Sequence, residues 1–509
     1  MSIFVPSSPL EPKPQNATGR VAFPDGFRWG AATAAYQVEG AAHTDGRTDS
    51  VWDAFARVPG AVLNGDDGEV ACDHYHRYAD DVALMRRLNL DTYRFSTSWA
   101  RVRPDGGPVN AKGLDFYSRL VDELLANDVM PWLTLYHWDL PQALEDKGGW
   151  TDRDTAYLFA EYAVTMHDAL GDRVGVWTTL NEPWCSAFLG YTSGAHAPGH
   201  QSKEKGLAAA HHLLLGHGLA VRELRSRAPE ANLGLTLNFT VSDPVDPADP
   251  ADVDAARRID GQFNRIFLDP VLRGEYPADV LADVEPYGLL DHVKDGDLEI
   301  ISTPIDTLGV NYYNGGAVSA HPQVAATSDA GEPAGDDAGG TRPEGVREET
   351  DGAPVRTTSS PYPAADGVHA HSRGLPRTDM GWEVQPEGMT RLLNRLQADY
   401  TGPRGVALYI TENGAAYPDV VAPDGSIDDQ DRLAFLDAHL RAVKDAIDDG
   451  ADVRGYLAWS LLDNFEWALG YSKRFGIVRV DYETQERTVK ASGEWFAQVA
   501  RENAVPQRP

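Results

Sequence analysis

Short apolar runs alternate with amphipathic helical stretches from about residue 21 to about residue 500. This alternation is typical of a parallel sheet whose outer face is covered by helices. Eight of the runs have the length and composition of strands, and they begin at Phe27, Thr92, Met130, Val174, Ala231, Ile305, Gly405 and Val453. Because eight strand–helix units close into a barrel, we predict an α/β fold with a single (β/α)8 TIM barrel and elaborated active-site loops.

The stretches between these runs show the periodicity of helices. The clearest of them places apolar residues at Leu436, Leu440 and Val443, which is helical spacing, and it is followed by Gly450. Glycine readily adopts the left-handed conformation that ends many helices, so we expect this helix to end there.

One segment interrupts the alternation. Residues 314–377 are rich in Gly, Pro, Ala, Ser and Asp and have no sustained apolar periodicity, so we predict a long polar loop. Its place after the sixth strand puts it on the active-site face, as a mobile lid, a rim or a disordered insertion, and we expect disorder from about Gln323 to Thr358. The catalytic barrel is then expected at 21–500, with a flexible N-terminal extension at 1–20 and a tail at 501–509.

Composition narrows the range of partners. The 509 residues carry a formal net charge of −32, which argues against binding to nucleic acid or to an anionic membrane surface. The N-terminus has no pattern of a signal peptide and no run of about 20 apolar residues occurs, so we expect a cytoplasmic protein without a membrane span. The two cysteines, Cys72 and Cys185, are too few for a disulfide framework or a cysteine-based zinc site.

The unusual polar and aromatic residues of the apolar runs gather toward their C-terminal ends. Barrel enzymes keep their active sites at this end of the strands, so we expect a site there. The residues concerned are Gln37, Arg94, His137, Asn181, Glu182, Asn311, Tyr313, Glu412 and Trp459.

Two glutamates stand out among them, Glu182 in TLNEP and Glu412 in ITENG. A single glutamate at a strand end is most often a solvated surface residue, but two on the fourth and seventh strands can face each other across the barrel mouth. Cleavage of a glycosidic bond needs such a pair, one to protonate the leaving oxygen and one to attack the anomeric carbon or to activate water. A separation of about 5 Å implies retention of configuration, and a wider one implies inversion.

Four separated motifs resemble those of family 1 glycoside hydrolases, the β-glucosidase family. They are FRWGAATAAYQVEGA, TLNEPW, LYITENG and AWSLLDNFEWALGYSKRFGIV, and the resemblance covers nearly the whole chain. It implies a retaining double displacement in which Glu412 is the nucleophile and Glu182 the general acid/base. Arg94 would keep Glu412 ionised, whereas a less solvated site next to a negative charge would raise the pKa of Glu182.

The resemblance also implies a sugar-binding set. Tyr313, whose alternative role is that of a core aromatic, is similar to the tyrosine that hydrogen-bonds the nucleophile, and Asn311 has the matching spacing. Trp459 resembles the indole on which the sugar stacks, although most of the twelve tryptophans are expected to be core. Trp184 resembles a wall on the aglycone side and Phe475 a residue lining the sugar pocket. The remaining members match residues that contact the nonreducing-end sugar: Gln37, His137, Trp138, Asn181, Glu466 and Trp467.

The expected substrates are small β-glucosides and short β-linked oligosaccharides, cleaved from the nonreducing end without a cofactor or a metal. Glu466 would repel a 6-phosphosugar, although Lys473 and Arg474 lie close by in the sequence. The histidines of HHLLLGHG are expected to be helical residues and not metal ligands. Activity as a β-galactosidase, a β-fucosidase or a transglycosidase remains an alternative, as does a noncatalytic sugar-binding barrel. The oligomeric state cannot be inferred from the sequence.

Overall fold

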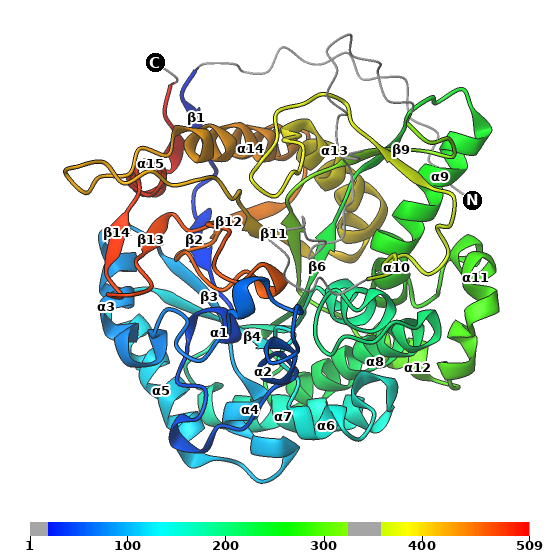
Figure 1. Cartoon of the computed structure of the whole chain (residues 1–509), viewed down its shortest axis with the longest axis horizontal. Coiled ribbons are helices and arrows are strands. Elements are labelled where there is room, and N and C mark those ends of the chain that lie inside the picture. Colours follow the sequence, from blue (N-terminus) through cyan, green and yellow to red (C-terminus); the bar gives the residue numbers. More distant parts are fainter. Residues whose placement is uncertain (1–18, 324–357, 508–509) are drawn as a thin grey trace.

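The computed structural model describes residues 19–323 and 358–507. Eight parallel strands close into a barrel in the order β11-β12-β2-β3-β4-β5-β6-β8, which confirms the predicted fold (Figure 1). Each of the eight predicted runs contains one barrel strand. The strands are β2 (Arg28–Ala32), β3 (Thr92–Ser96), β4 (Met130–Tyr136), β5 (Val176–Asn181), β6 (Asn232–Phe239), β8 (Thr307–Tyr312), β11 (Ala407–Asn413) and β12 (Val453–Trp459).

Helices surround the barrel. The longer ones are α3 (His74–Arg87), α5 (Ala111–Ala126), α7 (Asp154–Leu170), α8 (Lys203–Arg227), α9 (Pro250–Asp260), α10 (Ile266–Arg273), α13 (Pro386–Leu396), α14 (Gln430–Asp448) and α15 (Ala491–Glu502). The shorter ones are α1 (Ala35–Val38), α2 (Val51–Ala56), α4 (Trp99–Val102), α6 (Gln142–Glu145), α11 (Ala278–Val284) and α12 (Asp297–Ile301). None of the helices in the described ranges combines the length and the apolar character that a membrane-crossing segment needs.

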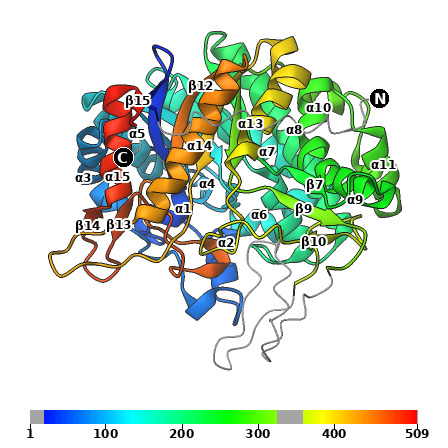
Figure 2. The same ribbon diagram turned by 90° about the horizontal axis from the view of Figure 1, so that it is seen from above.

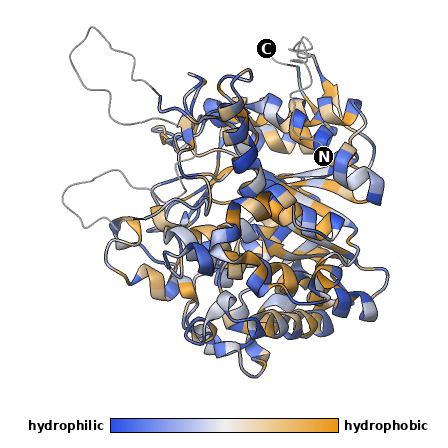
Figure 3. Ribbon diagram, turned by 90° about the vertical axis from the view of Figure 1, so that its right-hand side faces the viewer, coloured by the Kyte–Doolittle hydropathy of each residue, from blue (hydrophilic) through white to orange (hydrophobic). Residues whose placement is uncertain are grey.

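The packing explains the two periodicities of the sequence. All six residues of β8 are buried, since the helices cover one side of the barrel wall and the interior fills the other. In α14, Leu436 and Leu440 are buried, whereas polar residues occupy the outer face, and Figure 3 shows the same mixture of hydrophobic and hydrophilic residues along the other helices. Gly450 lies just beyond the end of α14 with a φ of +107°, as its role in ending the helix requires.

The segment expected to be a long polar loop is not a loop throughout. Near its start lies β9 (Gly316–Ser319) and near its end β10 (His369–His371), which pair antiparallel, and β7 (Ser242–Pro244) pairs with the other side of β9. Strands of three or four residues are too short to show a periodicity, which is why the sequence pattern missed them. Figure 2 shows this small sheet at the right of the molecule. Most of the stretch expected to be disordered, 324–357, lies outside the described residues.

The two ends of the described chain meet. β1 (Val21–Ala22) pairs antiparallel with β15 (Ala504–Val505), and α15 continues to Glu502, two residues past the predicted domain boundary. This pairing joins segments from opposite ends of the chain, which a short C-terminal pattern cannot reveal. A further hairpin of β13 (Val478–Val480) and β14 (Arg487–Val489) precedes α15.

Candidate active site

The register of the parallel strands brings the predicted site residues together at the C-terminal mouth of the barrel. Glu412 on β11 is paired with Asn311 on the neighbouring β8. Asn181 is the last residue of β5, and Glu182 follows it directly. Because parallel strands end at the same rim, residues from distant parts of the chain converge on one pocket.

Two donors hold the carboxylate of Glu412. A guanidinium nitrogen of Arg94 lies 2.6 Å from Glu412 Oε1, and the Tyr313 hydroxyl donates to Oε2 at 2.7 Å. Burial raises the pKa of Glu412, and the contacts of Arg94, Tyr313 and Asn311 act against that rise. Burial and the neighbouring carboxylates Glu412 and Glu182 hold the pKa of Tyr313 well above its ordinary value, so its hydroxyl stays a donor. The predicted contacts of Arg94 and Tyr313 with Glu412 are present.

Glu182 lies in a different environment. Asn311 Nδ2 donates to Glu182 Oε1 at 2.6 Å, and Thr411 Oγ1 fixes that amide by donating to Asn311 Oδ1 at 2.7 Å. Its backbone has a φ of +45°, an unfavourable conformation for a residue with a side chain. Arg94 and Tyr313 thus contact the carboxyl group of Glu412, and Asn311 contacts that of Glu182.

Arg94 also connects the two halves of the pocket through Asn181. A second guanidinium nitrogen donates to Asn181 Oδ1 at 2.6 Å, and the Asn181 amide donates to His137 Nε2 at 3.0 Å. Burial, together with the charge of Arg94, holds the pKa of His137 well below its ordinary value, so the imidazole is neutral and Nδ1 carries its hydrogen. Trp138 donates its indole N–H to the Asn181 carbonyl at 3.0 Å. The indole N–H of Trp138 is therefore already bonded to the backbone, so Trp138 can contact a sugar only through its ring.

Two further residues expected to bind the sugar, Gln37 and Glu466, follow β2 and β12. Gln37 Nε2 donates to Asn464 Oδ1 at 3.0 Å and to the Phe465 carbonyl at 2.8 Å, whereas its Oε1 is buried without a partner among the described residues. That oxygen suits a sugar hydroxyl, since a buried acceptor is rarely left unsatisfied. Glu466 is 7% exposed, and burial together with the charges of Glu412 and Glu182 raises its pKa to about 8.

Aromatic rings complete the same side of the pocket. Trp459 and Trp467 each stack against His137 with ring centroids 5.9 Å apart, and Phe475 lies edge-on to Tyr313 at 6.1 Å. Other tryptophans are core residues, as expected: Trp52, Trp99, Trp132, Trp150 and Trp177 are fully buried.

Trp184, which is expected on the aglycone side, has aromatic neighbours that the sequence did not indicate. It packs on Phe263 at 4.4 Å between ring centroids and on Tyr362 at 5.8 Å. Tyr362 belongs to the segment predicted to be a polar loop, and Phe263 lies in the π-helix η6 (Gly261–Arg265) between α9 and α10. Asn464, which holds Gln37, was likewise missed, although it lies in the DNFEW motif. These contacts depend on tertiary proximity, for which a single sequence offers no signal.

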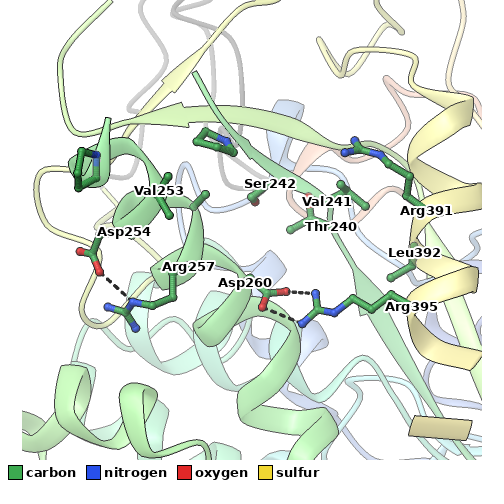
Figure 4. A pocket seen from close by; sticks show the side chains of 13 residues that line it. Thr240, Val241, Ser242, Val253, Asp254, Arg257, Asp260, Arg391, Leu392 and Arg395 are labelled. Atoms are coloured by element: carbon green, nitrogen blue, oxygen red, sulfur yellow. Dashed lines mark hydrogen bonds and ion pairs between the residues drawn. The ribbon is translucent and has the colours of Figure 1, made fainter. Parts of the chain in front are cut away.

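A separate cavity of about 240 Å³ lies between α9 and α13, outside the barrel (Figure 4). It is lined by none of the predicted site residues, and its charged groups largely pair with one another, as Arg395 does with Asp260 at 2.6 Å. The chemistry of the strand ends, not this cavity, marks the active site. The histidines expected to be helical lie in α8, where His211 hydrogen-bonds Asp297 at 2.9 Å.

A (β/α)8 barrel with two buried carboxyl groups at its mouth, next to amide and indole groups suited to a sugar, defines the class of glycoside hydrolases. The chain matches the model of glycosyl hydrolase family 1 over residues 20–505. It therefore belongs to this family and is a hydrolase of O-glycosides.

Named relatives cover almost the whole chain. It is 50% identical over 491 residues to thermostable beta-glucosidase B of Thermobispora bispora, spanning 96% of this chain and 93% of that protein. It is 46% identical over 489 residues to a bifunctional beta-D-glucosidase/beta-D-fucosidase of Bifidobacterium breve, spanning 93% and 97%. Among solved structures, the psychrophilic beta-glucosidase BglU from Micrococcus antarcticus matches with a TM-score of 0.88 and 55% identity, covering 95% of this chain and 98% of that one.

Proposed function

We propose that the protein is an exo-acting β-glucosidase that works by retention, with Glu412 as nucleophile and Glu182 as general acid/base. The observation that carries this assignment is the pair of donors on Glu412. Arg94 and the Tyr313 hydroxyl bind the Glu412 carboxylate and stabilise its negative charge, whereas the amide N–H of Asn311 donates to Glu182. A nucleophile must be ionised, and an acid must be able to hold its proton.

Membership of the family supports a two-step reaction. In the first step a Glu412 oxygen attacks the anomeric carbon, the bond to the aglycone oxygen breaks, and that oxygen takes the proton of Glu182. In the second step a water molecule gives a proton to Glu182 and attacks the same carbon, and Glu412 departs with the electron pair of the glycosyl–enzyme bond. Arg94 orients Asn181 by donating to its Oδ1, which supports a contact of Asn181 with the 2-hydroxyl, where a hydrogen bond strengthens as the transition state forms.

The substrate preference rests on the sugar side of the pocket. Gln37 Oε1 and the carboxyl group of Glu466 are acceptors for hydroxyls of a terminal hexose, and Trp459 offers an apolar face. Lys473 bonds the side chain and the carbonyl of Asp379, and Arg474 bonds Asp463, so both cations are already paired and do not offer a phosphate site. Small β-glucosides and short β-linked oligosaccharides fit this pocket, and tolerance of β-fucosides would match the name of the Bifidobacterium relative.

Nucleophile and acid/base variants test the assignment. Glu412→Ala should abolish turnover of an aryl β-glucoside, and added azide should restore product as the α-glucosyl azide. Glu182→Ala should retain turnover of substrates with good leaving groups, and azide should there yield the β-glucosyl azide. Full activity of Glu412→Ala, or azide products of the opposite configurations, would refute the assignment. Hydrolysis itself separates an enzyme from a noncatalytic barrel, and product analysis at high substrate concentration separates hydrolysis from transglycosylation.

A panel of kcat/KM values for nitrophenyl sugars and β-linked disaccharides tests the substrate class. The highest value is expected for a β-glucoside or a β-fucoside. A preference for a β-galactoside or a 6-phosphoglucoside would overturn the proposal for the sugar side while leaving the roles of the two glutamates intact.

A further inference from the structure

Cys185 lies against the carboxyl group of Glu182. Its Sγ is 3.2 Å from Glu182 Oε2, while Asn311 Nδ2 is 2.6 Å from Oε1. Cys185 is 2% exposed and Glu182 is 5% exposed. The two oxygens of this carboxyl group therefore face different partners, an amide on one side and a thiol on the other.

The turn after β5 places the thiol there. Glu182 adopts its positive φ, and the backbone N–H of Cys185 then donates to the Glu182 carbonyl at 3.0 Å. Cys185 is also the first residue of a π-helix, η5 (Cys185–Ser193), a rare conformation that is frequent at functional sites. The backbone around Glu182 thus turns back so that the side chain three residues later meets its carboxyl group.

A second contact orients the thiol. Asn238, near the end of β6, donates from Nδ2 to Cys185 Sγ at 3.6 Å. Sulfur is a weak acceptor and its S–H a weak donor. Because the amide N–H approaches the sulfur as a donor, the thiol hydrogen is available to an acceptor, and Glu182 Oε2 is in range.

We propose that Cys185 is a positioning residue for the acid/base: its thiol donates a hydrogen bond to Glu182 Oε2 and steadies the ionised form that exists after the aglycone has left. This inference rests on the proposed role of Glu182. The thiol and Asn311 together fix the orientation of the carboxylate while a water molecule approaches for the second step. A thiol is suited to this task because it is a weak donor. It stabilises the carboxylate only slightly, so the pKa of Glu182 stays high enough for the residue to act as an acid.

The surroundings of Glu182 determine the direction of the effect. Burial and the negative charges of the nearby carboxyl groups favour the protonated form of Glu182, and donors to its oxygens favour the ionised form. The titratable and charged groups that face this pocket from the neighbouring strands and loops are Glu412, Glu466, Arg94, Tyr313 and His137. Removal of the thiol should therefore leave Glu182 protonated to a higher pH.

The fall of kcat/KM at alkaline pH, here called the alkaline limb, measures this titration. It reports the pKa of the essential acid in the free enzyme. With an aryl β-glucoside of poor leaving ability, Cys185→Ala should move the limb upward by about 0.5 pH unit and slow the second step at neutral pH. Cys185→Ser retains a donor and should keep the limb at or below its original position. Cys185→Val fills the site without a donor and should move the limb as Cys185→Ala does, which separates the hydrogen bond from the loss of packing.

Cys72 provides the matched control. It is fully buried and its thiol contacts the Asp463 carbonyl at 3.0 Å, so Cys72→Ser should leave the limb unchanged. An unmoved limb in Cys185→Val, or equal shifts in Cys185→Val and Cys185→Ser, would overturn the proposal. Glu182→Ala tests the underlying assignment separately: the alkaline limb should disappear in that variant, and its persistence would refute the role of Glu182 whatever Cys185 does.

Discussion

Glu466 couples the substrate pocket to the stability of the protein. Its carboxyl group is buried next to Glu412 and Glu182, and burial and these charges raise its pKa to about 8 from an ordinary value of 4.5. A carboxyl group that is harder to ionise in the folded chain than in the unfolded chain favours folding only while it is protonated. Its contribution to stability is thus complete below pH 4.5 and is lost as the pH rises through 8.

The change Glu466→Gln removes this titration while keeping the shape of the side chain. The rise of the pKa from 4.5 to about 8 destabilises the folded protein by about 5 kcal/mol at pH values above 8, since each pKa unit is about 1.4 kcal/mol. Water entering the pocket screens part of this effect, so we expect the folded protein to lose about 2–3 kcal/mol of stability. A chain of this length has an unfolding entropy of about 1 kcal/mol/K, and the variant should gain about 2–3 °C in Tm relative to the original protein between pH 5.5 and pH 9.

The assay is thermal unfolding of both proteins across that pH range at one scan rate, because large proteins often unfold irreversibly. Glu230→Gln is the control, since Glu230 is exposed and should show no pH-dependent difference. A difference in Tm between Glu466→Gln and the original protein that stays constant from pH 5.5 to pH 9 would refute the raised pKa. The same variant should lose about 10- to 100-fold in kcat/KM for glucosides, because the amide has one oxygen fewer to bond the sugar hydroxyls.

Three further variants separate the parts of the site. Tyr313→Phe removes the hydroxyl that donates to Glu412 and should lower kcat by about 10- to 100-fold, and an unchanged kcat would argue against that contact in solution. Asn464→Ala removes one of the two acceptors that hold the Gln37 amide and should raise KM about equally for all aglycones; a change confined to particular aglycones would contradict the placement of Gln37 on the sugar side. Tyr362→Ala opens the contact with Trp184 and should change the ranking of aryl aglycones while the glucose-to-galactose ratio stays constant, and a panel in which only that ratio moved would contradict it.

Part of the active site could be predicted because strand ends are visible in a sequence. A buried parallel strand is a short apolar run, and in a barrel the polar residues at its C-terminal end face the mouth. Glu182 and Glu412 were recognisable in this way, and so was Arg94 on the second apolar run. The segment at 314–377 was only partly predictable. Its strands β9 and β10 are too short to show an alternating pattern, and they form by pairing with each other.

The sequence by itself determined the barrel, the order of its eight strands along the chain and the presence of a carboxyl group at the ends of two of them, because alternation and periodicity are local properties. The tertiary structure decided which groups meet those carboxyl groups. The contact of Cys185 with Glu182 depends on a positive φ and a π-helical turn, and the pKa of Glu466 depends on burial and on two carboxylates brought near from distant strands. Hydrogen bonds and charge–charge interactions depend on distances in space, and these groups come within range of one another only when the barrel has formed.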